Sequence, residues 1–292
     1  MTRPPVALTI AGSDPSGGAG IQADLKTFSA LGVYGTSVIT ALTAQNTRGV
    51  TGVHVIPREF VTQQLETLVA DVRIDAIKIG MLANAAIIGA VADFLQRHDF
   101  VDCVVLDPVM VATSGDRLLD GEAVQAMRDL MPLASIVTPN IAEAAVLLDT
   151  RPARSLPDMR LHAMALQALG APRVLIKGGH HDDGPEAVDL LLDVDGEARL
   201  RAPRVDTVNT HGTGCTLSSA LAALRPQRDS WFEAALDAKT WLTAALGAAD
   251  MLEISHGKGG HGPVHHFHQI WDGTRSSSES LGGEVRRPSR GG

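Results

Sequence analysis

A cysteine follows a glycine turn in the stretch NTHGTGCTLSSA, which runs from Asn209 to Ala220. This residue, Cys215, is one of two cysteines among 292 residues. A glycine turn of this kind is typical of a loop that leads into a helix, whose first N–H groups and dipole can bind an anion. A helix N-terminus also lowers the pKa of a thiol. The pattern predicts an anion site with a reactive thiolate, or else a small buried cysteine packed at a helix start.

Two other stretches carry groups that suit phosphate chemistry. Lys177 ends the apolar run RVLIKGG, and a lysine on a buried strand needs an anionic partner, either a phosphate or a structural carboxylate. In TPNIAEAAVLL, Asn140 and Glu143 stand at i and i+3 on one helix face. They fit a helix-capping box, and they also fit a hydrated Mg²⁺ held beside phosphates through water, because Mg²⁺ takes few protein oxygens. Both interpretations stay open.

A glycine loop near the N-terminus predicts the approach of a small ligand. In GSDPSGGAGIQADL, the residues from Gly18 to Ala23 match a loose dinucleotide fingerprint. We reject that interpretation because no acidic residue occurs between Asp24 and Glu59 to hold a ribose. Asp24 lies near the edge of the buried face of the following helix, where it either looks into a pocket or stabilises the helix dipole. Gln45, after a strand, offers a donor and an acceptor side by side, which match the edge of an aminopyrimidine.

Five histidines gather in SHGKGGHGPVHHFHQIW: His256, His261, His265, His266 and His268. Their spacing fits no standard zinc site, and neither a cysteine nor a pair of carboxylates accompanies them. A folded C-terminal segment is therefore favoured over a metal site.

These residues must be positioned by alternating strands and helices. Short β-rich runs start at Val6, Ser37, Asp75, Cys103, Ser135, Arg173 and Asp189. Helical patterns cover 21–31, 61–69, 85–96, 121–130, 142–148, 159–169, 216–224 and 230–252. Such alternation predicts an α/β fold with a mostly parallel sheet and helices on both faces. Several unusual residues follow apolar runs directly, so we expect them along the rim formed by the carboxyl ends of the strands. They are Gly12-Ser13-Asp14, Gln45-Asn46, Gly80-Met81, Asp107-Pro108, Pro139-Asn140 and Lys177-Gly178-Gly179.

Composition limits the function classes. The net charge of −8 and the absence of basic blocks argue against nucleic-acid binding. A short apolar run before Asp14 and polar residues throughout 27–47 predict neither a secretory signal nor a membrane span, so we expect a cytoplasmic protein. Residues 1–271 are predicted to form one domain, and the Ser/Gly/Arg-rich tail 272–292 is predicted to be disordered.

With these motifs assembled, the chain resembles the ribokinase-like superfamily, and within it the bacterial hydroxymethylpyrimidine/phosphomethylpyrimidine kinases of thiamine biosynthesis. The resemblance is carried in order by LTIAGSDPSGGAGIQADLKTFSALG, SVITALTAQNT, DVRIDAIKIGML, VVLDPVM, TPNIAEAAVLL, LIKGGH, NTHGTGCTLSSALAAL and GPVHHFH. It implies a three-layer α/β/α fold, usually a homodimer. It also implies phosphorylation by ATP with Mg²⁺ of 4-amino-5-hydroxymethyl-2-methylpyrimidine, and then of its monophosphate.

The resemblance also implies roles for single residues. Cys215 occupies the place where most sugar kinases of the superfamily carry an aspartate base. The implied pyrimidine pocket is Ala19, Asp24, Gln45, Met81 and Val109. The implied metal and phosphate region is Asn140, Glu143, Lys177 and the turn Gly212, Thr213 and Gly214, with Lys239 near the phosphates. Two other functions are weighed against this one: a pyridoxal or pyridoxine kinase of the same fold, and a non-catalytic pyrimidine-binding regulator.

Overall fold

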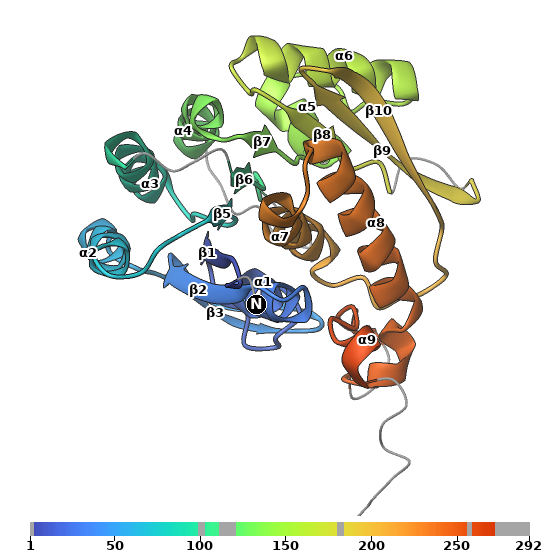
Figure 1. Cartoon of the computed structure of the whole chain (residues 1–292), viewed down its shortest axis with the longest axis horizontal. Helices are drawn as coiled ribbons and strands as arrows, with labels where there is room; N and C mark the ends of the chain where they lie inside the picture. The colour runs from blue at the N-terminus through green and yellow to red at the C-terminus, as the bar shows by residue number, and fades with distance from the viewer. Residues whose placement is uncertain (1–2, 99–102, 111–120, 180–183, 256–258, 272–292) are drawn as a thin grey trace, which may run out of the picture.

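The computed structural model describes residues 3–98, 103–110, 121–179, 184–255 and 259–271. Within these residues, eight strands form one sheet in the order β10-β9-β8-β7-β6-β5-β1-β2 (Figure 1). Neighbouring strands from β2 to β8 are parallel, and β9 and β10 add an antiparallel edge. The strands are β1 (Val6–Ala11), β2 (Tyr34–Ile39), β5 (Ala76–Ile79), β6 (Val104–Leu106), β7 (Ile136–Val137), β8 (Val174–Ile176), β9 (Glu186–Asp193) and β10 (Gly196–Pro203). The predicted tail, 272–292, lies outside the described residues.

Helices cover both faces of the sheet, which confirms the predicted three-layer α/β/α fold (Figure 1). One face carries α2 (Arg58–Val69), α3 (Ala85–Arg97), α4 (Gly121–Leu130), α5 (Ile141–Leu148) and α6 (Leu156–Ala168). The other carries α1 (Gly20–Ala30), α7 (Thr213–Leu224) and α8 (Trp231–Gly247). The short helix α9 (His268–Trp271) lies beyond the end of α8 (Figure 1). Turns of 3₁₀ helix occupy Met131–Leu133, Arg225–Gln227 and Ala249–Leu252.

The two-residue period of the strands decides which side chains meet which helices. In β1, Leu8 and Ile10 enter the core on the side of α2 and α3, whereas Ala7 enters the core against α7 and α8. Thr9 shares the face of Ala7, and its register partner on β5 is Lys78. A threonine and a lysine are thereby turned into the buried layer between the sheet and α7, where both side chains are fully buried.

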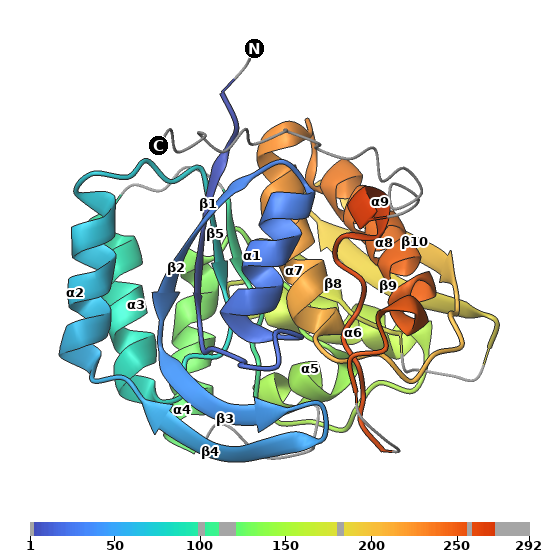
Figure 2. The ribbon, with the colours of Figure 1, turned by 90° about the horizontal axis from the view of Figure 1, so that it is seen from below.

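A two-stranded hairpin departs from the sequence prediction. The run from Ser37 was predicted to be one strand, but the structure divides it into β2 and β3 (Ala41–Asn46), and β3 pairs with β4 (Gly49–Val55). Thr40 separates the two strands: it is fully buried, and its hydroxyl donates to the carbonyl of Met81 at 2.6 Å. The chain therefore leaves the main sheet, and the hairpin lies across the carboxyl end of β2 (Figure 2).

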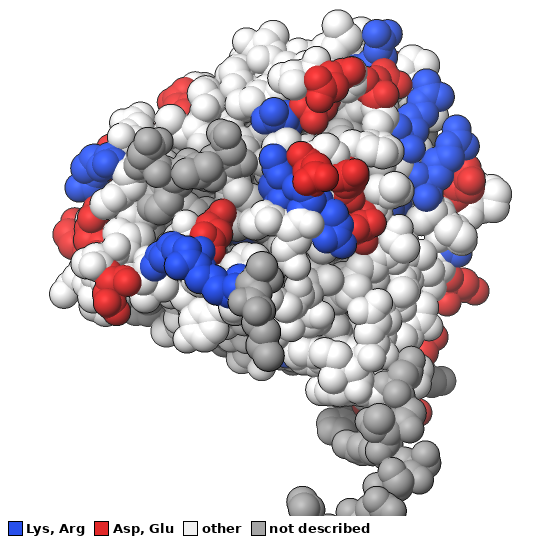
Figure 3. Space-filling model, viewed as in Figure 1, with Lys and Arg blue, Asp and Glu red and all other residues white. Residues whose placement is uncertain are grey.

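Basic and acidic side chains are interspersed on the face shown in Figure 3. Exposed pairs such as Arg201 with Glu186, at 2.8 Å, place opposite charges side by side on the surface. None of the helices in the described part of the chain is long and apolar enough to cross a membrane.

Candidate active site

The turn before Cys215 brings two glycine-containing loops into contact. Gly212 has φ +75°, and a Cβ at this position would collide with the backbone oxygen of Gly18. Only glycine relieves both constraints, because it tolerates positive φ and lets the two backbones approach. Helix α7 then begins at Thr213, three residues earlier than predicted, so Cys215 stands in its first turn. The N–H groups of a first helical turn have no acceptor within the helix and are free to meet an anion.

Thr213 serves the turn itself. Its hydroxyl donates to the carbonyl of Thr210 at 2.6 Å, and its N–H donates to the same carbonyl at 3.3 Å. Thr213 therefore stabilises the shape of the turn with both of its donor groups. The N–H groups of Gly214 and Cys215 are left for an anion, and a contact between Thr213 and phosphate stays a prediction.

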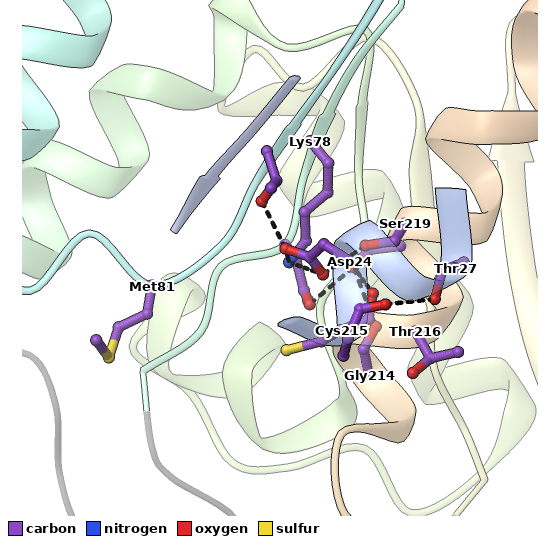
Figure 4. A network of polar contacts seen from close by, with 12 residues as sticks. Asp24, Thr27, Lys78, Met81, Gly214, Cys215, Thr216 and Ser219 are labelled. Carbon is purple, nitrogen blue, oxygen red and sulfur yellow. Dashed lines mark hydrogen bonds and ion pairs between the residues drawn. The ribbon is translucent and has the colours of Figure 1, made fainter. Parts of the chain in front are cut away.

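Two carboxylate–lysine pairs lie beneath the first turn of α7. Ser219 donates to Asp24 Oδ1 at 2.6 Å, and both oxygens of Asp24 lie 2.9 Å from Lys78 Nζ (Figure 4). Ser218 donates to Asp107 Oδ2 at 3.1 Å, and Asp107 Oδ1 lies 2.6 Å from the ammonium of Lys177. Ser218 and Ser219 follow Cys215 by one helical turn, so each pair approaches the cysteine from below.

The predicted acidity of Cys215 is wrong for this state of the protein. Burial raises the pKa of the thiol, and the carboxylates of Asp24 and Asp107 raise it further. Lys78 and a hydrogen bond from the backbone of Gly20 lower the pKa without offsetting the rest. The prediction counted the dipole of one helix, whereas desolvation and two buried carboxylates favour the neutral thiol. Cys215 is therefore mostly protonated at neutral pH.

Lys177 is the centre of the predicted metal and phosphate region. Its ammonium lies 2.6 Å from Asp107 Oδ1 and 3.7 Å from Glu143 Oε2, and both neighbours raise the pKa of Lys177. A Cβ at Gly214 would lie 3.3 Å from the same nitrogen. The ammonium is thus held between two carboxylates and the first turn of α7, where an anion bound at that turn would meet it.

Asn140 and Glu143 form the capping box that the sequence left open. The Asn140 N–H donates to Glu143 Oε2 at 2.7 Å, and the Glu143 N–H donates to Asn140 Oδ1 at 2.8 Å. Burial raises the pKa of Glu143 to about 7, because it outweighs the favourable charge of Lys177. The second carboxylate oxygen of Glu143 remains for a hydrated Mg²⁺, whose preferred ligands are oxygens and water. No group of three or more His, Cys, Asp or Glu side chains within the described residues is placed to hold a metal by itself.

Gln45 lies on the inner side of the hairpin, at a bulge in the β3–β4 pairing that re-aims its side chain. Its Nε2 is 3.4 Å from Nε2 of His211, which lies 2.7 Å from Asp14 Oδ2. Burial raises the pKa of Asp14, but hydrogen bonds from His211 and Ser16 outweigh burial and leave that pKa lowered. Since Asp14 is ionised, the facing nitrogen of His211 carries the proton, and it offers no acceptor to the Gln45 amide. The Gln45 N–H groups are therefore available to a ligand.

The other residues implied for the pyrimidine pocket lie on the same rim. Met81 follows β5 and packs against Gly12, where its Cε occupies the space that a Cβ of Gly12 would need. Half-buried Val109 follows β6. Ala19 precedes α1, and its N–H donates to Asp14 Oδ2 at 2.8 Å. Figure 4 shows the Cys215 sulfur projecting from α7 on the side where Met81 lies.

Asp24 corrects one sequence prediction. It was expected to look into the pyrimidine pocket, but its side chain is fully buried, and Thr9, Ser219 and Lys78 together satisfy both carboxylate oxygens. The buried helix face was correctly recognised, but the first turn of α1 carries no acidic residue, so the alternative interpretation of Asp24 as an acid that stabilises the helix dipole is also wrong. The partner on β5 could not be seen from the sequence. The carboxylate is bonded to Lys78, and its charge also raises the pKa of Cys215.

Lys239 is connected to the predicted phosphate region through Asp189. Its ammonium is 2.7 Å from Asp189 Oδ2, and Asp189 Oδ1 accepts the N–H of Gly178 at 2.9 Å. The lysine thus supports the loop that follows Lys177, and its contact with phosphate stays a prediction.

The part of the histidine-rich segment that the structure describes, residues 259–271, is folded, as predicted. Of its described members, His265, His266 and His268 are buried. His266 Nε2 lies 3.1 Å from the hydroxyl of Thr216, which directly follows Cys215 in the chain. Burial lowers the pKa of His266 to about 3, so the ring is neutral and packs beside the start of α7. His256 lies outside the described residues.

The residues that sequence analysis missed are mainly partners. Asp14 and Asp107 were noted as strand-end residues without a role, and His211, Lys78, Ser218 and Ser219 were not singled out. A signal existed for His211, which directly precedes the glycine turn, and for Lys78, which is a charge inside an apolar strand. Their pairing, across 197 residues for His211 with Asp14, depends on the fold.

Comparison with known proteins gives one consistent family. Residues 14–265 match the family model described as phosphomethylpyrimidine kinase. The hydroxymethylpyrimidine/phosphomethylpyrimidine kinase of Salmonella typhimurium is 59% identical over 266 residues, covering 91% of this chain and 98% of the relative. Among solved structures, phosphomethylpyrimidine kinase from Clostridium difficile is 41% identical, with a TM-score of 0.73, covering 83% of this chain and 99% of that one. Pyridoxal kinase from Bacillus subtilis, solved as an ADP complex, is 36% identical, with a TM-score of 0.83. The match covers 92% of this chain and 100% of that one.

Proposed function

The chain belongs to the phosphomethylpyrimidine kinase family, and from this premise we propose that it phosphorylates 4-amino-5-hydroxymethyl-2-methylpyrimidine with ATP and then phosphorylates the monophosphate to the diphosphate. The observation that carries the proposal is the match to a hydroxymethylpyrimidine/phosphomethylpyrimidine kinase over nearly the whole length of both chains. The site supports it, since a cysteine, a helix N-terminus and a buried lysine meet at one rim of the sheet. An ADP complex of a solved neighbour supports ATP as the co-substrate.

In the first transfer the acceptor is a neutral alcohol, so a base must take its proton as the O–P bond forms. We assign this role to the thiolate form of Cys215. The N–H groups of Gly214 and Cys215 and the ammonium of Lys177 stabilise the charge on the transferred phosphoryl group. Mg²⁺ would neutralise phosphate charge when bound, and Asn140 and Glu143 would hold it through water. In the second transfer the acceptor is a phosphate oxygen that is already anionic, so no base is required.

The proposal is tested by mass spectrometry of the products formed from the pyrimidine alcohol and ATP. We expect the monophosphate to appear first and the diphosphate to follow at its expense. Absence of both products in an otherwise folded preparation would reject the proposed function, and accumulation of the monophosphate alone would reject its second half.

Pyridoxal is a second candidate substrate, because a pyridoxal kinase is among the similar solved structures. It also carries a hydroxymethyl group on a heteroaromatic ring. The higher identity to a pyrimidine kinase favours the pyrimidine as the main substrate. Comparing kcat/KM for the two alcohols decides between them. The homodimer and the cytoplasmic location stay predictions from the resemblance and the composition.

Replacing Gln45 with leucine is expected to weaken binding of the pyrimidine alcohol by about 10- to 100-fold, since the buried polar edge of the ligand loses a partner worth about 1–3 kcal/mol. Titration calorimetry measures the affinity. Gln167→Leu is the matched control, because Gln167 bonds the carbonyl of Pro172 in an exposed position. If the Gln45 variant binds as tightly as the control, Gln45 is not part of the pocket.

A further inference from the structure

Lys78 is a charged residue on a fully buried strand, and the stability of the fold does not explain why a lysine is there. It lies on the central strand β5, fully buried, with its ammonium 2.9 Å from each oxygen of Asp24. Thr9 donates to Asp24 Oδ2 at 2.5 Å and Ser219 to Oδ1 at 2.6 Å, so each carboxylate oxygen has two donors. Desolvating two charges costs several kcal/mol per ion, and apolar residues of similar volume often replace such a pair without loss.

The tip of Lys78 is held in a fixed place, and Asp24 links it to Ser219 of α7. A Cβ at Gly80 would lie 2.8 Å from the lysine nitrogen and 3.1 Å from the Cβ of Ala11, so a glycine makes the room for the ammonium. Ser219, which fixes Asp24, follows Cys215 by one turn on the same face of α7 (Figure 4). The charge of the lysine and that of the cysteine act directly on each other.

The charges that act on the sulfur come from four different places in the fold. Asp24 comes from α1, Lys78 from β5, Asp107 from the end of β6 and Lys177 from the end of β8. Among the groups that change the pKa of Cys215, burial has the largest effect and raises it, and Lys78 has the largest opposing effect. Asp24 raises the pKa by less than Lys78 lowers it. Lys78 is therefore the charge on which ionisation of Cys215 depends most.

We propose that Lys78 is a positioning residue for the first phosphoryl transfer: its ammonium, anchored by Asp24, is the buried positive charge against which Cys215 ionises. The inference deepens the proposed function and rests on the role of Cys215 as the base. In the step, the alcohol O–H bond breaks and its proton joins the sulfur, while the oxygen forms a bond to the γ-phosphorus and the bond to ADP breaks. The neutral thiol then returns its proton to solvent, which restores the thiolate.

The test removes the pair without leaving a charge unpaired. In the double variant Lys78→Met with Asp24→Asn, the side chains keep nearly the same shape, and the hydroxyls of Thr9 and Ser219 can donate to or accept from the new amide. Alkylation of Cys215 by iodoacetamide is followed across pH 6–10 by mass spectrometry of its peptide. We expect the profile to move to higher pH and alkylation at neutral pH to slow by about tenfold, the factor that corresponds to one pH unit.

The two transfers provide the second readout. We expect kcat of the first transfer to fall by about 10- to 100-fold, which is no more than the loss of about 10²- to 10⁴-fold that removal of the base itself would cause, while the second transfer stays within about fivefold. The matched control is Arg173→Met with Asp193→Asn, which removes an ion pair of 2.7 Å at the opposite end of β8. The control should change neither the alkylation profile nor the ratio of the two rates.

Equal loss of both transfers together with an unmoved alkylation profile would overturn the proposal, because packing would then be the only role of Lys78. Thermal unfolding verifies that each variant is folded. If the Met/Asn pair does not fold, Lys78→Gln with Asp24→Asn replaces it, since two amides can bond to each other in the same space, and the expected results are the same. The proposed function fails separately, when the unmodified chain does not make the two products.

Discussion

Alanine in place of Cys215 is expected to slow phosphorylation of the pyrimidine alcohol by about 10²- to 10⁴-fold, the usual contribution of a positioned general base. Phosphorylation of the monophosphate should change by less than about tenfold, because its attacking oxygen carries no proton that must be removed. The ratio of the two rates, measured separately with each acceptor, is the diagnostic quantity. It isolates the proton transfer from effects on ATP binding, which both steps share.

The raised pKa of Cys215 adds a pH dependence with a definite sign. A protonated thiol accepts no proton, so kcat/KM of the first transfer should rise with pH as the thiolate fraction grows, and should level off above the pKa of Cys215. The second transfer should not show this rise, nor should the residual first transfer of the alanine variant.

Cys103→Ala is the matched control, since the same atoms are removed from a buried cysteine just before β6, at the opposite end of that strand from Asp107. Its ratio of rates should equal that of the unmodified chain. Parallel loss of both transfers in the Cys215 variant would contradict the base role and would indicate that the cysteine only packs the helix start.

The fold was predictable because its strands are covered on both faces. Strand runs such as the one that follows Arg173 are mostly apolar. Short strand runs alternate clearly with longer helical patterns, so the sequence pattern identified the α/β fold class. The errors occur where one face is open. β3 and β10 carry exposed side chains largely in alternation, and β4 is exposed along most of its length, so their burial pattern gives a weak signal in the sequence. The break at Thr40 depends on a hydrogen bond to Met81, 41 residues further along.

The site was predictable in its positions and less so in its electrostatics. The rule that ligands bind at the carboxyl ends of parallel strands placed Asn140 and Lys177 on one rim, and the structure brings them together in a β-bridge, with Glu143 3.7 Å from the ammonium of Lys177. The pKa of Cys215 depends on Asp24, Asp107 and Lys78, which reach it from three other elements. A rule about one helix terminus cannot include these three residues, because only the folded chain brings them near Cys215.

In the proposed mechanism, the fully buried Lys78 and the partly buried Lys177 act on different groups because they have different neighbours. Lys78 has no exposed surface and is enclosed by Asp24, so its charge is directed at Cys215 and through it at the acceptor proton. Lys177 keeps 13% of its side chain exposed and lies beside Gly214, so its charge is directed at whatever anion binds to the first turn of α7. Their loss should therefore affect different steps.

Replacing Lys177 with methionine is expected to slow both transfers, each by about 10²- to 10³-fold, which is the cost of removing one preorganised group that stabilises charge in a transition state. Both reactions move the same γ-phosphoryl group past the same helix terminus, so both need this ammonium. The loss also leaves Asp107 and Glu143 without their shared partner, and two carboxylates then face an incoming phosphate. Steady-state rates with the alcohol and with the monophosphate measure the effect.

Lys26→Met is the matched control, because the ammonium of Lys26 donates to the carbonyl of Gly17 at 2.7 Å instead of lying between carboxylates, and we expect it to keep most of both rates. A Lys177 variant that lost only the first transfer would behave like the Cys215 variant, and would assign Lys177 to ionisation of the thiol. A folded Lys177 variant that kept both rates would remove the lysine from the phosphate site. Equal loss in the two steps is the result that a shared phosphoryl contact requires, since the acceptor differs between them and the transferred group does not.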